Sequence, residues 1–129
     1  MTWFVALWGP ALAVMAVIFV ASGLPNLQRL PGDVDDHVAH FAGYALLSAL
    51  FVRALAGARW AGVTWRTAAL AWVLSVIYGA SDEWHQRFVP GRFAAVDDWV
   101  ADALGAAAAA VTLLTMAKAI GRRREGREV

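Results

Sequence analysis

The chain has 129 residues, of which 60% are hydrophobic and only 16% are charged, and its formal net charge is +1. Because an average soluble domain contains about 25% charged residues, this composition indicates a single integral membrane domain. The net charge gives no argument for nucleic-acid binding, since the basic residues are gathered at particular places and do not cover one face. Cysteine is absent, which excludes disulfides, thiolate nucleophiles and cysteine-type zinc sites.

The first expected span is an uncharged run of 19 residues at positions 3–21. A helix needs roughly 20 apolar residues to cross the hydrocarbon core of a membrane. A cleaved signal peptide is the alternative interpretation, because small residues precede Gly23. However, no Lys or Arg precedes the run, and the run is longer than the usual apolar core of a signal peptide. We therefore expect a retained membrane helix.

A polar loop and a second span follow. Residues 24–36 contain two prolines, a glycine and three aspartates, so they cannot continue the helix and form a loop in contact with water. Either Asp35 or Asp36 can cap the next helix by accepting hydrogen bonds from its free backbone N–H groups. This second span is expected to reach about residue 56, and a short turn occupies residues 57–65.

The third and fourth spans are expected on either side of a Pro-Gly turn. The third begins at Arg66 and continues to Glu83. Pro90 and the glycine after it end this helix, because proline lacks a backbone donor and disfavours helical geometry at the residue before it. The fourth span begins around Asp97 or Asp98 and continues through the alanine-rich stretch that ends at Met116.

The distribution of Lys and Arg predicts the orientation. The middle loop with its adjoining helix ends and the C-terminal tail together hold eight of these residues, whereas the other two loops hold three. By the positive-inside rule, both termini and the middle loop face the cytoplasm. We therefore predict an all-α integral membrane bundle of four transmembrane helices at residues 1–120, followed by a cytoplasmic basic tail at residues 121–129. The expected location is the inner (cytoplasmic) membrane, as a multi-pass protein.

Three of the spans carry polar residues at helical spacing near their outer ends. Residues four apart lie on one face of a helix, and charged residues in a membrane avoid hydrocarbon at a cost of several kcal/mol each. The stripes should therefore face one another, and the small residues from Gly105 to Ala110 allow neighbouring helices to approach closely. The three stripes are Asp36, His40 and Tyr44; Tyr78, Asp82 and Gln86, with Glu83 beside Asp82; and Asp98, Asp102 and Gly105.

Two interpretations of these stripes remain open. In the first, the polar residues only hold the bundle together, as buried polar networks in membrane proteins do. In the second, they form a site, because the carboxylates of the three stripes outnumber Arg87 and Arg92 and perturb one another's ionisation. These carboxylates are Asp36, Asp82, Glu83, Asp98 and Asp102. Arg92 follows the Pro-Gly turn and could hold a phosphate or carboxylate group, or could pair with Asp97 or Asp98.

The sequence predicts no metal site and no cofactor. His40 with two carboxylates offers the nitrogen and oxygen ligands that zinc accepts. However, Glu83 and His85 are two residues apart and point about 200° away from each other on a helix. No H-E-x-x-H pattern is present, and no serine has the flanking glycines of a nucleophile elbow.

The polar residues occur in the order and at the spacing of a known family, and the sequence resembles the VanZ-like family of small bacterial membrane proteins. The resemblance covers residues 36–105 and the flanking spans. Two positions depart from the family pattern: His37 stands where Lys is frequent, and Asp102 stands where Asn is frequent, which adds a carboxylate. The resemblance rests on Asp36, His40, Phe41, Tyr44, Asp82, Glu83, Gln86, Phe88, Pro90, Arg92, Asp98 and Gly105.

The resemblance implies a multi-span protein of the bacterial cytoplasmic membrane. The family is named for a member associated with resistance to the glycopeptide antibiotic teicoplanin, and neither that role nor a substrate follows from the residues of this chain. Our first hypothesis is an outward-facing pocket that recognises a lipid headgroup, a cell-wall precursor or an amphiphilic glycopeptide. The expected ligand-binding residues are Asp36, His40, Tyr44, Asp82, Glu83, Gln86, Arg92, Asp98 and Asp102.

Two other functions are kept as alternatives. A membrane-embedded enzyme would use Glu83 or Asp82 as general base and His40 as acid on a lipid-linked substrate of the outer leaflet. A proton or ion pathway is less well supported, because the inner halves of the expected spans lack ionisable residues. The expected partners are membrane lipids, with a cell-wall precursor or a lipoglycopeptide as further candidates.

Overall fold

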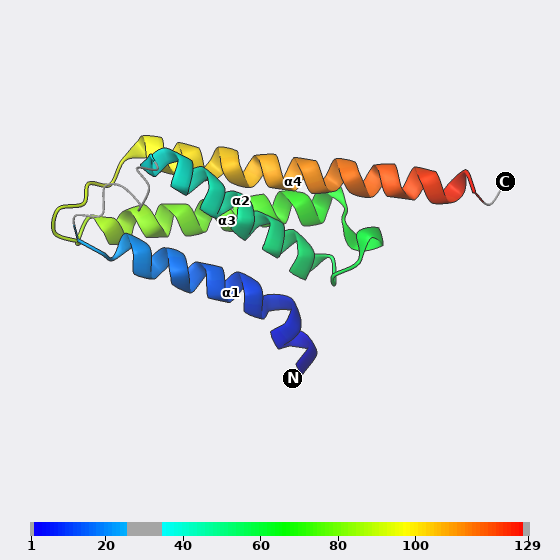
Figure 1. The fold of residues 1–129 in the computed structure, drawn as a ribbon, viewed down its shortest axis with the longest axis horizontal. Helices are drawn as coiled ribbons and strands as arrows, with labels where there is room; N and C mark the ends of the chain where they lie inside the picture. Colours follow the sequence, from blue (N-terminus) through cyan, green and yellow to red (C-terminus); the bar gives the residue numbers. More distant parts are fainter. Residues whose placement is uncertain (1, 26–34, 128–129) are drawn as a thin grey trace.

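The computed structural model describes residues 2–25 and 35–127 and contains a bundle of four α-helices (Figure 1). Part of the predicted loop at residues 24–36 therefore lies outside the described residues. The helix α4 lies along one side of the bundle, α1 lies along the other, and α2 and α3 lie between them (Figure 1). The helices are α1 (Thr2–Ser22), α2 (Asp36–Leu55), α3 (Trp65–Gln86) and α4 (Val96–Glu125), with a short 3-10 helix η1 (Trp60–Gly62) between α2 and α3.

Three of these helices, α1, α2 and α4, are long and apolar enough to cross a membrane. The helix α3 has 22 residues, which is also sufficient length. It is less apolar, because Arg66 lies at its start and Asp82 and Glu83 lie near its end. The predicted all-α fold is thus confirmed, together with three of the four predicted spans by length and composition.

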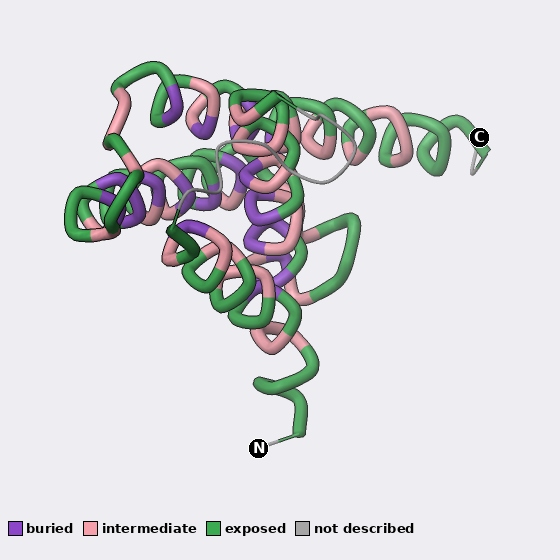
Figure 2. The backbone as a smooth tube through the Cα atoms, turned by 60° about the vertical axis from the view of Figure 1, so that its left-hand side comes forward, coloured by how far each residue is buried: buried purple, intermediate pink, exposed green. Residues whose placement is uncertain are grey.

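The surface of the bundle is apolar. Large hydrophobic side chains are exposed on every helix, including Phe19 on α1, Leu46 on α2, Ile77 on α3 and Val111 on α4. Burial is concentrated where α2, α3 and α4 face one another, and most of α1 is exposed (Figure 2). A continuous apolar surface of this kind is suited to contact with lipid and not with water.

The helix ends follow from local chemistry. The carboxylate of Asp35 accepts a hydrogen bond from the His37 N–H at 3.0 Å, which confirms the predicted cap of α2. Thr64 and Thr67 form a reciprocal capping box at the start of α3, which the sequence reading did not identify. The helix α4 continues to Glu125, so the first residues of the predicted basic tail are helical.

A proline in α1 is compensated by a side chain from α2. Pro10 has no N–H to donate to the carbonyl of Ala6, four residues earlier. The guanidinium of Arg53 donates to that carbonyl at 3.0 Å and to the carbonyl of Leu7 at 3.3 Å. The contact holds α1 against the end of α2 that is remote from the predicted polar stripes.

The helices α2 and α4 approach each other closely at Gly105. A Cβ atom added to Gly105 would lie 2.8 Å from the carbonyl carbon of Phe41 on α2, closer than real Cβ atoms approach. Next to Gly105 on α4, the carbonyl of Ala106 accepts a hydrogen bond from the Ser48 hydroxyl at 2.9 Å. The small residues of α4 therefore bring its backbone against that of α2, as the sequence predicted.

We predict that Gly105→Ala destabilises the bundle, because its new methyl group would overlap the α2 backbone and overpacking costs about 1–3 kcal/mol. Gly121→Ala is the matched control on the same helix, since a Cβ atom at Gly121 meets no atom within 4 Å. Thermal unfolding in detergent should show a lower Tm for Gly105→Ala only. Equal Tm values for both variants would contradict the close approach.

Candidate functional site

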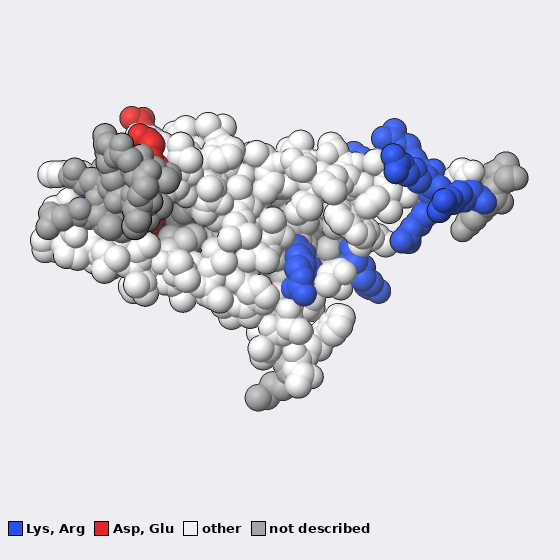
Figure 3. Space-filling view, in the orientation of Figure 1, with Lys and Arg blue, Asp and Glu red and all other residues white. Residues whose placement is uncertain are grey.

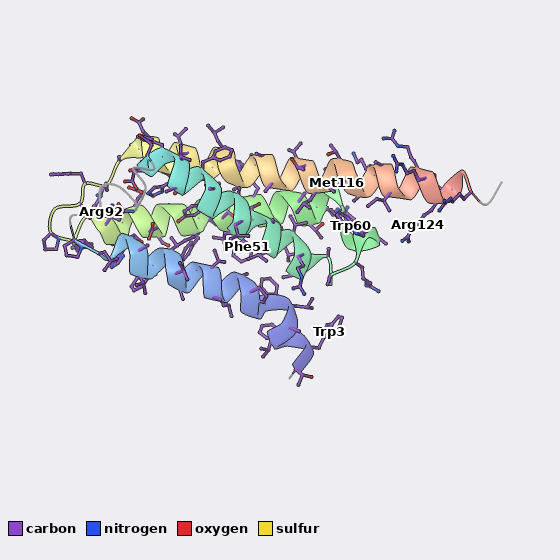
Figure 4. The ribbon with its side chains drawn as sticks, in the orientation of Figure 1. Trp3, Phe51, Trp60, Arg92, Met116 and Arg124 are labelled. Atoms are coloured by element: carbon purple, nitrogen blue, oxygen red, sulfur yellow. The ribbon has the colours of Figure 1, made fainter. Side chains whose placement is uncertain are left out.

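The predicted site residues lie at one end of the bundle, where α2 begins, α3 ends and α4 begins (Figure 1). Arg92 lies at this end, in the connection between α3 and α4, whereas Trp60 and Arg124 lie toward the opposite end (Figure 4). We call this region the polar end. It is formed by the nine predicted residues, Asp36, His40, Tyr44, Asp82, Glu83, Gln86, Arg92, Asp98 and Asp102.

At the centre of the polar end, His40 on α2 contacts Asp102 on α4. The distance from His40 Nδ1 to Asp102 Oδ1 is 2.8 Å. Asp102 is fully buried, and the His40 side chain is 9% exposed. The His40 ring is parallel to the ring of Tyr44, one turn further along α2, at a centroid distance of 6.4 Å. The close approach at Gly105 lies one turn below Asp102 on α4, and it allows the pair to form.

The second feature of the polar end is the carboxylate of Asp82 on α3. The hydroxyl of Ser22, the last residue of α1, donates to Asp82 Oδ1 at 2.5 Å. The amide of Gln86 donates to Asp82 Oδ2 at 3.3 Å. Ser22, Asp82 and Gln86 are all buried. Ser22 therefore connects α1 to the polar residues of the other helices.

The remaining carboxylates contact different partners. Glu83 Oε2 accepts from the backbone N–H of Ala95 at 2.9 Å, which fixes the connection before α4. Asp36 Oδ2 lies 3.7 Å from Arg92 Nη1. Asp98 Oδ1 lies 3.6 Å from Nε2 of His37, too far for a hydrogen bond. Arg92 thus pairs with Asp36, whereas the sequence suggested Asp97 or Asp98.

Several buried oxygen atoms at the polar end accept or donate no hydrogen bond within the part of the chain that the structure describes. They are the hydroxyl of Tyr44, Oε1 of Glu83, Oδ1 of Asp98 and Oδ2 of Asp102. Buried polar atoms are paired in the great majority of cases, and an unpaired one costs about 1–3 kcal/mol. Such a group of acceptors is consistent with a site that receives donors or a cation.

A cavity of about 230 Å³ lies at the polar end. One wall is apolar and is formed by Val17, Ile18 and Ala21 of α1. The opposite side carries polar side chains from α2, α3 and the connection that follows α3, beside Ala39 and Gly43 of α2. The polar lining residues are Ser22 of α1, together with Asp36, His40, Tyr44, Asp82 and Arg92.

The structure brings the predicted residues together in different ways. Asp36, His40, Tyr44, Asp82 and Arg92 line the cavity. Gln86 and Asp102 support cavity residues through hydrogen bonds. Glu83 and Asp98 lie at the polar end but do not line this cavity.

The sequence reading missed Ser22 and gave His37 no contact with Asp98. Ser22 is the last residue of an uncharged helix, and small residues there suggested a possible cleavage site. The sequence feature that could have identified Ser22 is its position: it is a hydroxyl residue at the end of α1 that lies beside the polar end. His37 precedes the cavity residue His40 by three positions, and this spacing places both histidines on nearly the same face of α2.

A family model for VanZ/LLP1 matches residues 36–117. The match includes α2, α3 and most of α4, and therefore more than half of the chain. The chain belongs to the VanZ/LLP1 family. The matched VanZ/LLP1 segment contains all nine residues of the polar end, whereas α1 with Ser22 lies outside it. Searches of curated proteins and of solved structures found no match.

Replacing Ser22 by Ala is expected to destabilise this VanZ/LLP1 protein by about 1–3 kcal/mol, because the buried Asp82 carboxylate loses a donor. Ser81→Ala is the control, since Ser81 is exposed and donates only to the carbonyl of Tyr78 among the described contacts. Thermal unfolding in detergent measures the difference. A Tm for Ser22→Ala equal to that of the control would show that the contact contributes nothing to stability.

Proposed function

We propose that the cavity at the polar end binds the polar headgroup of a membrane amphiphile at the outer face of the membrane. The observation that carries the proposal is the cavity's two-sided lining. Residues of α1 provide an apolar wall, and side chains of α2, α3 and the following connection provide charged and hydrogen-bonding groups. An amphiphile has the same two parts, so an apolar chain can follow α1 while the headgroup contacts the polar walls.

The size of the cavity favours a small headgroup. Sites for drug-sized ligands enclose about 300–1,000 Å³, and this cavity is smaller, at about 230 Å³. A whole glycopeptide antibiotic is far larger than this volume. Among the ligands suggested by the sequence, a lipid headgroup or the headgroup of a lipid-linked precursor is therefore preferred.

The charges along the cavity favour a headgroup that carries both signs. Asp36 and Asp82 provide carboxylates, and Arg92 provides a guanidinium that can hold a phosphate group. A phosphoethanolamine group carries an ammonium for the carboxylates and a phosphate for the guanidinium. We therefore propose a zwitterionic amino-phosphate headgroup as the preferred class.

The proposal includes a four-span topology in which α3 also crosses the membrane. Its length, its central position in the bundle and its exposed apolar residues Leu70, Val73 and Ile77 support this. Lys and Arg side chains gather at the end remote from the polar end, around the C-terminal part of α4 and near η1 (Figure 3). By the positive-inside rule, that end is cytoplasmic and the polar end faces outward.

Single cysteines can test this topology, because the natural chain contains none. Ala61, Phe93 and Gly126 are exposed, so a cysteine at each position can be labelled without disturbing the core. We predict that a membrane-impermeant maleimide labels Phe93→Cys in intact cells, and labels Ala61→Cys and Gly126→Cys only after permeabilisation. Labelling of Ala61→Cys and Phe93→Cys from the same side would show that α3 does not span.

Headgroup binding can be measured by native mass spectrometry of the full chain in detergent. We predict that phosphatidylethanolamine binds more tightly than phosphatidylglycerol, which has no ammonium, and phosphatidylcholine, whose ammonium has no N–H. Asp82→Asn should weaken phosphatidylethanolamine binding by about tenfold, because a charge-assisted hydrogen bond is lost. Asp97→Asn is the control, since Asp97 is exposed and does not line the cavity. Equal binding of all three lipids to all variants would contradict the proposal.

An enzyme is the second candidate, and the His40–Asp102 pair favours it. A buried carboxylate 2.8 Å from one ring nitrogen orients the imidazole, as a general acid or base requires. His40 lines the cavity and Asp82 does too, whereas Glu83 does not. Asp82 is therefore the better of the two proposed bases. Incubation of the same preparations with headgroup-labelled lipids separates the candidates: a released headgroup identifies an enzyme, and intact bound lipid identifies a binding protein.

A further inference from the structure

Three side chains from three different helices converge inside the polar end. One ligand atom each from His40 on α2, Glu83 on α3 and Asp102 on α4 lies within 4.8 Å of the others. All three are well buried, with exposures of 9% for the His40 side chain, 8% for Glu83 and 0% for Asp102. Burial of two carboxylates beside each other is unfavourable unless positive charge is supplied.

A second observation concerns the oxygen atoms that these residues leave free. Oε1 of Glu83 and Oδ2 of Asp102 are buried and accept no hydrogen bond from any described residue. The hydroxyl of Tyr44, close to His40 on the same helix, is likewise unpaired within the described chain. The cluster is therefore acidic and also has unpaired oxygen atoms that can bind a metal ion.

We propose that His40, Glu83 and Asp102 bind a divalent transition-metal ion such as Zn²⁺ or Mn²⁺. One imidazole nitrogen and two carboxylate oxygens form the mixed ligand set that such ions accept. The ligand atoms of one ion, bound at about 2.0–2.2 Å, lie at most about 4.4 Å apart. Small side-chain movements from the described positions would therefore close the site around an ion.

The orientation of His40 supports this assignment. Its Nδ1 atom lies 2.8 Å from Asp102 Oδ1 and would exchange this hydrogen bond for the ion. Its Nε2 atom would carry the N–H, and a small movement would bring it from 4.0 Å to hydrogen-bond distance of Asp36. Histidines that bind metals commonly donate their other N–H to a carboxylate. Asp36 is therefore expected to position the ring and not to bind the ion.

A neighbouring set, Asp36, His40 and Asp98, also places its ligand atoms within 4.8 Å of one another. It is the weaker candidate, because the Asp36 side chain is 32% exposed and lies 3.7 Å from the guanidinium of Arg92. A nearby cation reduces the affinity of a carboxylate for a metal ion. In addition, this set comes from α2 and α4 only, so α3 would contribute no ligand.

The proposed metal site is inferred from these contacts and does not depend on headgroup binding. Excess negative charge is the physical reason for it. Within the described chain, Asp36, Asp82, Glu83, Asp98 and Asp102 gather at the polar end, and the basic side chains that contact them are Arg92 and the two histidines His37 and His40. A divalent ion between Glu83 and Asp102 would offset their two charges.

The test uses the full chain, purified in detergent without a histidine tag and treated with a chelator. Zn²⁺ or Mn²⁺ is then added, and bound metal is measured by mass spectrometry and by titration calorimetry. We expect one tightly bound ion per chain and a rise in Tm with added metal. Glu83→Gln and Asp102→Asn should each lower the affinity by at least about tenfold, while Asp97→Asn, on the same helix as Asp102, should bind as the natural chain does.

Two further measurements keep the test decisive if a variant fails to fold. Co²⁺ bound to the natural chain should give visible absorption and an X-ray absorption spectrum with an imidazole ligand. Absence of stoichiometric binding by the natural chain, for Zn²⁺ and Mn²⁺ alike, would overturn the proposal. Loss of binding in Asp36→Asn and Asp98→Asn, with Glu83→Gln unaffected, would also overturn it and would place the ion in the neighbouring set.

Discussion

The close approach of α2 and α4 at Gly105 is the contact on which the polar end depends. Without a side chain at this position, the α4 backbone packs against the backbone of Phe41. Asp102 lies one turn nearer the end of the bundle, so it reaches His40 on the facing helix at 2.8 Å. A larger residue at position 105 would separate the helices and leave Asp102 without this partner.

The same geometry explains how an apolar bundle can contain several carboxylates. Asp82 and Glu83 are each buried against a donor from another segment, the Ser22 hydroxyl for Asp82 and the Ala95 N–H for Glu83. These contacts do not satisfy every oxygen atom within the described residues. Structural pairing therefore accounts for part of the network, and the unpaired oxygen atoms of Glu83 and Asp102 are part of the reason to propose that this end binds a ligand.

The helix α1 contributes differently from the other three. It lies outside the segment matched by the VanZ/LLP1 model, and most of its surface is exposed. The side-chain hydrogen bonds that hold it include those of Arg53 to the carbonyl of Ala6, of Tyr78 to the carbonyl of Met15, and of Ser22 to Asp82. Because it forms the apolar wall of the cavity, it supplies the lipid-like side of the proposed site.

The sequence by itself determined the helical class, the approximate helix limits and the residues that converge, because helical periodicity and the cost of charge in lipid act locally. It could not determine pairing, since partners such as Ser22 and Asp82 are 60 positions apart. It left open whether Arg92 holds an anionic group or pairs with Asp97 or Asp98, and the structure places its guanidinium 3.7 Å from Asp36. Only the tertiary structure decided which side chains touch, because helix rotation and separation depend on packing such as that at Gly105.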